Sequence, residues 1–215
     1  MKLSDHVENI RKQIETAFIN RLGRMGITDI RIADVSSIPA EYQADRERID
    51  TIREVWISET GSNHNAYEKL VEELTFTLFN RIAALKVMEA HEFHPEIITR
   101  RSQHGDRSFA HKLWLENNPN AGKEEREGLL RFIEDRFTDL AADIPLFSPE
   151  HPYHLLPTDN ELNEIILVFN KVDSDPQIED NIWKSDDVLG WLYESYNNYK
   201  KTIIKKVATK QSTIK

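Results

Sequence analysis

Residues 65–92, with the sequence NAYEKLVEELTFTLFNRIAALKVMEAHE, decide the fold. One set of apolar side chains recurs every three or four residues and comprises Leu70, Val71, Leu74, Leu78, Ile82, Leu85 and Met88. This spacing predicts one long α-helix with a continuous apolar face. Phe76, Phe79 and Ala83 extend the apolar character around the cylinder, which is typical of a helix at the centre of its domain. We therefore expect the rest of the chain to pack around this helix.

Helix signals also mark six further segments, namely 4–22, 41–57, 108–116, 124–141, 159–172 and 186–206. The sequence Thr158-Asp159-Asn160-Glu161 is a capping box at the start of one of them. Residues 27–35 alternate apolar and charged side chains and predict at most one short strand. The four prolines in 144–157 predict an extended connection. The sequence thus predicts a mainly α fold, a bundle of about seven helices around the long central helix 65–92.

The chain is expected to divide into an N-terminal helical segment (1–60), a helical domain (61–206) and a basic tail (207–215) that begins a linker, unless all form one domain. The formal net charge of −9 is unevenly distributed, because the last sixteen residues carry six lysines and no acid. Residues 1–199 therefore carry a net charge of −15. An acidic body disfavours non-specific binding to nucleic acid, so contact with DNA would require a local basic patch.

Composition excludes several kinds of chemistry. The chain has no cysteine, which excludes disulfides, thiolate zinc sites, iron–sulfur clusters and cysteine nucleophiles. No stretch of 18 apolar residues could span a membrane, and the N-terminus lacks the apolar core of a signal peptide. We therefore expect a cytoplasmic protein that does not act at a membrane.

Catalytic motifs are also absent from the sequence. The pairs His91/His94 and His151/His154 have a spacing at which one helix face can hold a metal ion. Prolines after His94 and His151 favour extended backbone there, so we expect no metal site. The sequence contains no P-loop, glycine-rich nucleotide fingerprint or metal-dependent nuclease motif. We predict no catalytic residue, and only scattered carboxylates would support a small-molecule enzyme.

Basic residues are concentrated in two segments, each a candidate for contact with the DNA backbone. Residues 97–115 carry a net charge of +3, and the lysine-rich end carries +6. The candidate residues are Arg100, Arg101, Arg107, Lys112, Lys200, Lys201 and Lys205. The alternative for the lysines is a solvated helix end, where positive charge favours the helix dipole.

Arg81 is the one cation in the most apolar part of the central helix. A charge among such neighbours requires a partner. We expect a buried ion pair that fixes helix packing, and the alternative is a role in a functional site. Asn80 and Glu89 are candidate partners in the sequence, but any acid on a packed helix could serve.

Three stretches resemble a known family in the same order along the chain. The first runs from Phe76 to Glu89 and contains F-N-R-I-A-A-L-K-V-M-E. The second combines I-P-L-F at 144–147 with L-L-P at 155–157, and the third is D-V-L-G-W-L-Y-E-S-Y at 187–196. Together they resemble the helical region of BREX-type (PglX-like) adenine-specific DNA methyltransferases and related type IIG restriction–modification enzymes. The residues that carry this resemblance are Phe79, Asn80, Arg81, Glu89, Pro157, Gly190, Trp191 and Tyr193.

The resemblance implies a non-catalytic helical region that precedes the methyltransferase domain of a phage-defence enzyme. In the implied full-length enzyme, S-adenosylmethionine is the methyl donor and adenine N6 in duplex DNA the acceptor, with the target base flipped out of the stack. The cofactor loop and catalytic motif of the family have no counterpart in this sequence, so no catalytic residue is carried over. The implied partners are the methyltransferase domain, double-stranded DNA and other defence proteins. The alternative is a freestanding helical module that binds other proteins.

Overall fold

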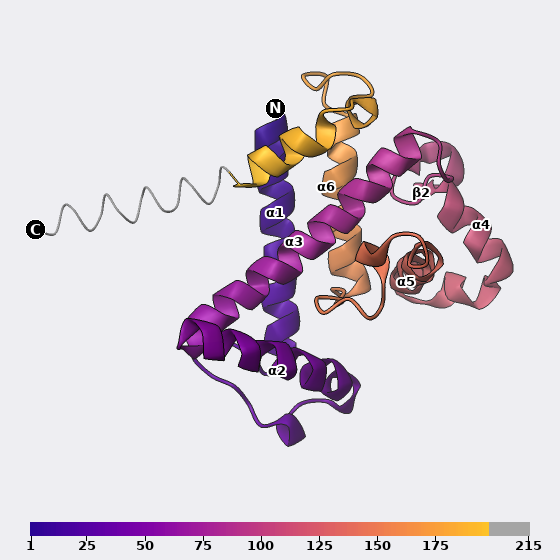
Figure 1. Cartoon of the computed structure of the whole chain (residues 1–215). Helices are drawn as coiled ribbons and strands as arrows, with labels where there is room; N and C mark the ends of the chain where they lie inside the picture. The colour runs from indigo at the N-terminus through magenta and orange to yellow at the C-terminus, as the bar shows by residue number, and fades with distance from the viewer. Residues whose placement is uncertain (198–215) are drawn as a thin grey trace, which may run out of the picture.

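A computed structural model describes residues 1–197 and has a mainly α fold, as predicted (Figure 1). The first three helices are α1 (Leu3–Arg24), α2 (Ala40–Thr60) and α3 (Asn63–Ala90). They are followed by α4 (Phe109–Asn117), α5 (Leu129–Leu140) and α6 (Asp159–Asp173). Residues 188–197 form a further helical segment. The predicted basic tail at 207–215, the part of the predicted helix 186–206 after residue 197, and Lys200, Lys201 and Lys205 lie outside the described residues.

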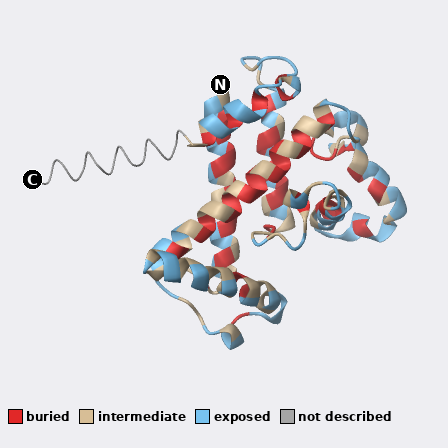
Figure 2. Ribbon diagram, in the orientation of Figure 1, coloured by how far each residue is buried: buried red, intermediate tan, exposed pale blue. Residues whose placement is uncertain are grey.

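The long helix α3 is central, as its sequence predicts. It contacts α1 and α2, and α1 also contacts α6. In Figure 1, α3 runs diagonally across the molecule. Phe79 of α3 packs between Phe169 of α6 and Tyr196, with ring centroids 5.8 and 5.1 Å away. Every helix contributes buried residues (red in Figure 2), and the buried hydrophobic ones form one core with members from both sides of residue 60.

Local sequence signals account for several helix ends. The Ser62 hydroxyl accepts a hydrogen bond from the Asn65 backbone N–H at the start of α3. The predicted capping box is formed at α6, where Thr158 and Glu161 each accept a backbone hydrogen bond from the other. Gly61 ends α2 with a left-handed φ of 76°, which allows α3 to begin two residues later.

The start of α5 differs from the prediction that a helix begins at residue 124. The chain forms a 3₁₀ turn there, and three residues in a row, Arg126, Glu127 and Gly128, have left-handed φ values of 48°, 57° and 65°. A right-handed helix cannot pass through left-handed residues, so α5 begins at Leu129.

The strand expected near 27–35 is reduced to a single antiparallel bridge between Ile27 and Ile32. The described residues instead contain a two-stranded antiparallel ladder, β1 (Arg100–Arg101) with β2 (Arg107–Ser108), in the basic segment. The 144–157 connection contains one short 3₁₀ turn at Pro145–Phe147 and is otherwise irregular. None of the helices within residues 1–197 combines the length and the hydropathy that a membrane span requires.

Candidate functional site

The arginines of the first basic segment lie together on the β1–β2 hairpin. Arg101 pairs directly with Arg107 across the ladder, and Arg100 pairs with Ser108. The turn between the strands closes through hydrogen bonds from the Arg107 guanidinium to the His104 and Gly105 carbonyls. Lys112 is exposed in the first turns of α4, directly after β2. We refer to residues 100–112 as the basic hairpin.

Two of these arginines are held by carboxylates from outside the hairpin. Arg101 donates to Glu96 from Nε and Nη2, at 2.9 and 2.6 Å. Arg107 donates to Glu127 from Nε at 2.6 Å and again from Nη2. These hydrogen bonds raise the pKa of both arginines. The two glutamates reduce the local charge from +3 to +1, a neutralisation that the sequence within 97–115 could not reveal.

Arg100 differs from its two neighbours. Its backbone N–H donates to Asn170 Oδ1 of α6 at 2.9 Å, which fixes the hairpin to the helix bundle. Burial, and secondly the charge of Arg126, lower the pKa of its guanidinium. Among the described residues, no carboxylate forms an ion pair with Arg100 or Lys112, and of the two only Lys112 is exposed.

The expected ion pair at Arg81 is wrong. The residue is 1% exposed, yet no carboxylate in the described part of the chain pairs with it. Instead Nε donates to the Leu146 carbonyl at 2.7 Å and Nη2 to the Ser148 carbonyl at 3.3 Å. The guanidinium also lies 5.1 Å above the Phe137 ring. Arg81 therefore attaches the irregular 144–157 connection to α3, and backbone carbonyls satisfy its donors in place of an acid.

His154 is the third polar partner of Arg81. Its Nδ1 lies 2.9 Å from Arg81 Nη1, and the guanidinium must be the donor because it has no acceptor. Burial, followed by the Arg81 charge, lowers the pKa of His154 to about 4. The ring is therefore neutral at pH 7, with its Nδ1 lone pair already used.

No group of three His, Asp or Glu side chains in residues 1–197 could hold a metal ion.

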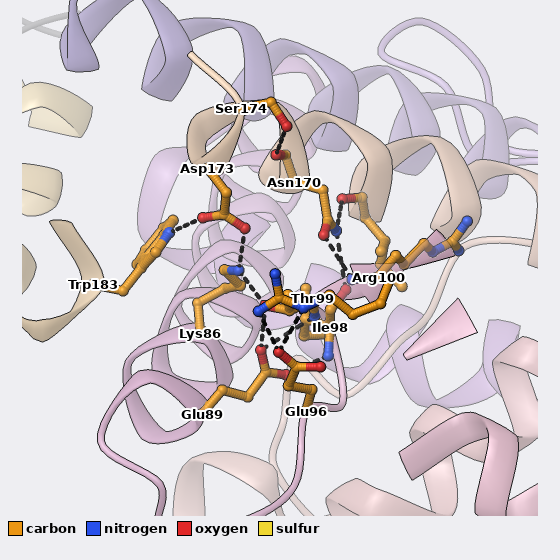
Figure 3. Close-up of polar contacts among 12 residues, drawn as sticks. Lys86, Glu89, Glu96, Ile98, Thr99, Arg100, Asn170, Asp173, Ser174 and Trp183 are labelled. Carbon is orange, nitrogen blue, oxygen red and sulfur yellow. Dashed lines mark hydrogen bonds and ion pairs between the residues drawn. The ribbon is translucent and has the colours of Figure 1, made fainter. Parts of the chain in front are cut away.

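Glu89 caps the segment that leads into the hairpin (Figure 3). Its Oε1 accepts the backbone N–H of Ile97 at 2.5 Å and also that of Ile98. Its Oε2 accepts the Thr99 N–H at 3.1 Å and the Thr99 hydroxyl at 2.8 Å. A carboxylate that is 8% exposed thus satisfies four donors, which keeps 97–99 on the end of α3. Asn80 is only half-buried and has no comparable role.

Lys86 joins this capped segment to the end of α6. Its Nζ lies 2.5 Å from Thr99 Oγ1 and 2.7 Å from Asp173 Oδ2, and its side chain is 3% exposed. Asp173 Oδ1 accepts the Trp183 indole N–H at 2.6 Å. Figure 3 shows Lys86 between the two groups, with Glu89 below and Asp173 above. The result is a polar network that connects three segments far apart in the sequence.

A cleft of about 1020 Å³ opens beside this network. Its walls are the C-terminal end of α3, residues 92–109 and the 173–184 loop, and Lys86, Glu89, Asp173 and Trp183 belong to its lining. No local motif predicts the cleft, because its walls come from segments separated by about eighty residues.

The third family-like stretch lies on the helical segment 188–197. Val188, Leu192 and Tyr196 are buried in the core, and the Tyr196 ring meets Phe76 of α3 with centroids 5.3 Å apart. Leu189, Trp191 and Tyr193 are 50%, 40% and 57% exposed. A Cβ built at Gly190 would meet no atom within 4 Å. Pro157 of the second stretch is buried, like Phe79 of the first.

Comparisons with known proteins identify no relative: no family model matches the chain, and no curated protein or solved structure matches it significantly. The resemblance to methyltransferases therefore rests on the three stretches themselves. The structure divides their residues into two groups. Phe79, Arg81, Glu89 and Pro157 hold the fold together, whereas Gly190 and Trp191 face outward. Tyr193 is also largely exposed, although one edge of its ring lies against Phe76 of α3, with centroids 6.2 Å apart.

Proposed function

We propose that this chain is the non-catalytic helical domain of an adenine-N6 DNA methyltransferase of a phage-defence or restriction–modification system. In this role it scaffolds the methyltransferase domain, which supplies the S-adenosylmethionine site and the catalytic residues. Its further partners are double-stranded DNA and other defence proteins in the cytoplasm. The support comes from the three ordered stretches and from the outward-facing residues of the third.

The observation that carries the proposal is the position of Gly190. The buried residues Val188, Leu192 and Tyr196 define the inner side of the helix, and at 100° per residue Gly190 lies nearly opposite them. A glycine inside a helix costs about 1 kcal/mol relative to alanine. Nothing in the described fold requires it, because the space around it is open. Glycine is favoured at position 190 if the backbone of another domain or protein packs closely against this outer side of the helix.

The side chains around Gly190 fit such an approach. Leu189 and Tyr193, one turn apart, lie on one flank of the helix, and Trp191 lies on the other. Three large apolar side chains on one exposed helical segment are typical of a protein–protein contact. We call Leu189, Gly190, Trp191 and Tyr193 the outer helix surface, and we place the methyltransferase domain there.

The test substitutes Gly190 within the full-length protein. Gly190→Leu should leave the described fold intact, since a larger side chain has room and leucine favours the helix. It should reduce N6-methyladenine in genomic DNA at least about tenfold, because the leucine blocks close docking. The matched control is Gly122→Leu, since Gly122 is also exposed with no atom near its Cβ. Methylation is measured by mass spectrometry of digested genomic DNA.

Two results would contradict separate parts of the proposal. If deletion of the gene leaves genomic N6-methyladenine unchanged, the methyltransferase assignment is wrong. If Gly190→Leu and Gly122→Leu methylate equally, the docking surface is wrong while the assignment stands. A freestanding interaction module, which the same exposed surface favours, predicts unchanged methylation together with loss of a co-purified protein in Gly190→Leu.

Contact between the basic hairpin and DNA is the second part of the proposal. Arg101 and Arg107 are paired with Glu96 and Glu127, so phosphates would have to compete with these carboxylates. Glu96→Gln with Glu127→Gln should therefore strengthen DNA binding by the full-length protein and steepen its salt dependence by up to about two phosphate contacts. Substitution of Arg100, Arg101 and Arg107 by alanine should do the reverse. Equal affinities and salt slopes in all variants would exclude the hairpin from the DNA interface.

A further inference from the structure

The cleft beside the Lys86–Asp173 network has an excess of negative charge. Three cations, Lys86, Arg101 and Lys184, belong to its lining. The six carboxylates of the lining are Glu89, Glu92, Glu96, Asp173, Glu179 and Asp180. A concave surface with one sign of charge in excess attracts ligands of the opposite sign. The cleft therefore favours a cation over a phosphate.

The carboxylates of the cleft floor are fully engaged within the chain. Glu89 accepts four hydrogen bonds, as described above, and Glu96 receives both donors of Arg101. Asp173 is bound by Lys86 and Trp183. Each of these three carboxylates thus already has hydrogen-bond donors from within residues 1–197.

The carboxylates at the cleft mouth are different. Glu179 and Asp180 are exposed, and no ion pair within residues 1–197 involves either of them. Glu92 has only Lys184 nearby, with 3.9 Å between Nζ and Oε1, and both side chains are more than half exposed. An exposed pair at that distance contributes little. The mouth thus presents three carboxylates that the other residues within 1–197 do not neutralise strongly.

The mouth also presents an unusual aromatic side chain. Phe93 is 75% exposed and stacks on His91, with centroids 5.7 Å apart and the planes at 19°. It follows Glu92, whose φ of 62° belongs to the turn that ends α3. In that turn the Phe93 N–H donates to the Met88 carbonyl and the Glu92 N–H to the Glu89 carbonyl, both at 3.0 Å. The helix end thereby places the exposed Phe93 ring in the lining of the cleft.

We propose that this cleft binds a basic segment of a partner protein, with an arginine or lysine side chain placed over Phe93 and facing Glu92, Glu179 and Asp180. The aromatic face attracts a cation within about 6 Å of its centroid, and the three carboxylates supply charge complementarity. A volume of about 1020 Å³ accommodates several side chains of an extended peptide. The cleft lining shares no residue with the outer helix surface, and this proposal does not depend on the methyltransferase proposal.

The probe is a fluorescein-labelled decapeptide of alternating arginine and alanine, titrated with the full-length chain and followed by fluorescence anisotropy. Glu179→Gln with Asp180→Asn should weaken binding about tenfold, because two of the three unneutralised carboxylates are lost. Phe93→Ala should weaken it about threefold through loss of the cation–π contact. The matched control is Glu116→Gln with Asp143→Asn, which removes the same charge from exposed positions outside the cleft lining.

The expected pattern is a one-to-one complex that the mouth variants weaken and the control variant leaves within about twofold. Circular dichroism should show native helix content in every variant, since all the substituted side chains are at the surface. Equal weakening by the mouth and control pairs would mean attraction to overall charge and would overturn the proposal. So would the absence of measurable binding, or equal binding of a decapeptide of alternating glutamate and alanine.

Discussion

Removal of the Glu89 carboxylate should be among the most destabilising single changes in the chain. Glu89→Ala leaves the N–H groups of Ile97, Ile98 and Thr99 and the Thr99 hydroxyl without their acceptor. Each buried donor left unpaired costs about 1–3 kcal/mol. Glu89 belongs to the cleft lining, so water reaches some of these donors and limits the total. We expect a loss of about 4 kcal/mol, a large part of the roughly 5–15 kcal/mol that stabilises a folded domain.

The assay is urea unfolding of the chain followed by far-ultraviolet circular dichroism, with a parallel thermal scan. A loss of about 4 kcal/mol corresponds to a fall in Tm of roughly 8–16 °C for a chain of this size. Glu89→Gln should cost about half as much, because its carbonyl oxygen still accepts while its amide group faces other donors. The control is Glu68→Ala on the same helix, where the side chain is 66% exposed and the change should stay within about 0.5 kcal/mol. The capping role is refuted if Glu89→Ala is no less stable than Glu68→Ala.

Three further changes have expected outcomes. Gly26→Ala should destabilise the chain by clearly more than Gly61→Ala in the same urea assay. Both glycines have φ above 70°, so alanine is strained at either position. A Cβ at Gly26 would in addition lie 2.7 Å from the Ala33 Cβ, whereas the space at Gly61 is open. The pKa of His154 is about 4 in the folded chain, against 6.5 for an ordinary histidine. As the pH falls, the imidazole is therefore protonated in the unfolded chain before it is protonated in the folded chain. Unfolding free energy should therefore fall by up to about 3 kcal/mol as the pH drops from 6.5 to 4, and His154→Gln should flatten this profile; an unchanged profile would contradict the shift. Arg81→Met should lower the unfolding free energy by about 2–4 kcal/mol, because the Leu146 and Ser148 carbonyls lose their donors; stability equal to that of the unsubstituted chain would exclude this attachment.

The helices could be predicted because their signals are local and repeated. The 3–4 spacing of apolar residues located α3 within two residues at each end, and the capping box located the start of α6. The predicted start of a helix at residue 124 was wrong, because α5 begins at Leu129, and this shows the limit of such patterns. Charged residues at 124–127 suit the first turn of a helix, and only the backbone at Arg126 and Glu127 reveals left-handed conformations. Periodicity reports which side chains can share a face, not the dihedral angles between them.

Contacts between distant segments could not be predicted in the same way. The sequence marked Arg81 as a charge that needs a partner, yet the partners are the Leu146 and Ser148 carbonyls, which any residue type could provide. The charge of the basic hairpin was overestimated for a related reason. Glu127 reaches Arg107 because the left-handed turn before α5 places it there, and no pattern within 97–115 contains that information.

The first family-like stretch has a structural task that is separate from its place in the core. Arg81 donates hydrogen bonds to backbone carbonyls of the irregular segment 144–157, and Glu89 accepts hydrogen bonds from backbone N–H groups of 97–99. The helix α3 thus holds one segment with a cationic donor and the other with an anionic acceptor. Irregular backbone cannot satisfy its own polar groups, and a buried charged side chain on a rigid helix provides a fixed partner. Loss of activity after substitution of Arg81 or Glu89 would therefore report loss of structure. Gly190 is the informative position, because a change there alters what can approach the outer helix surface while the described packing stays the same.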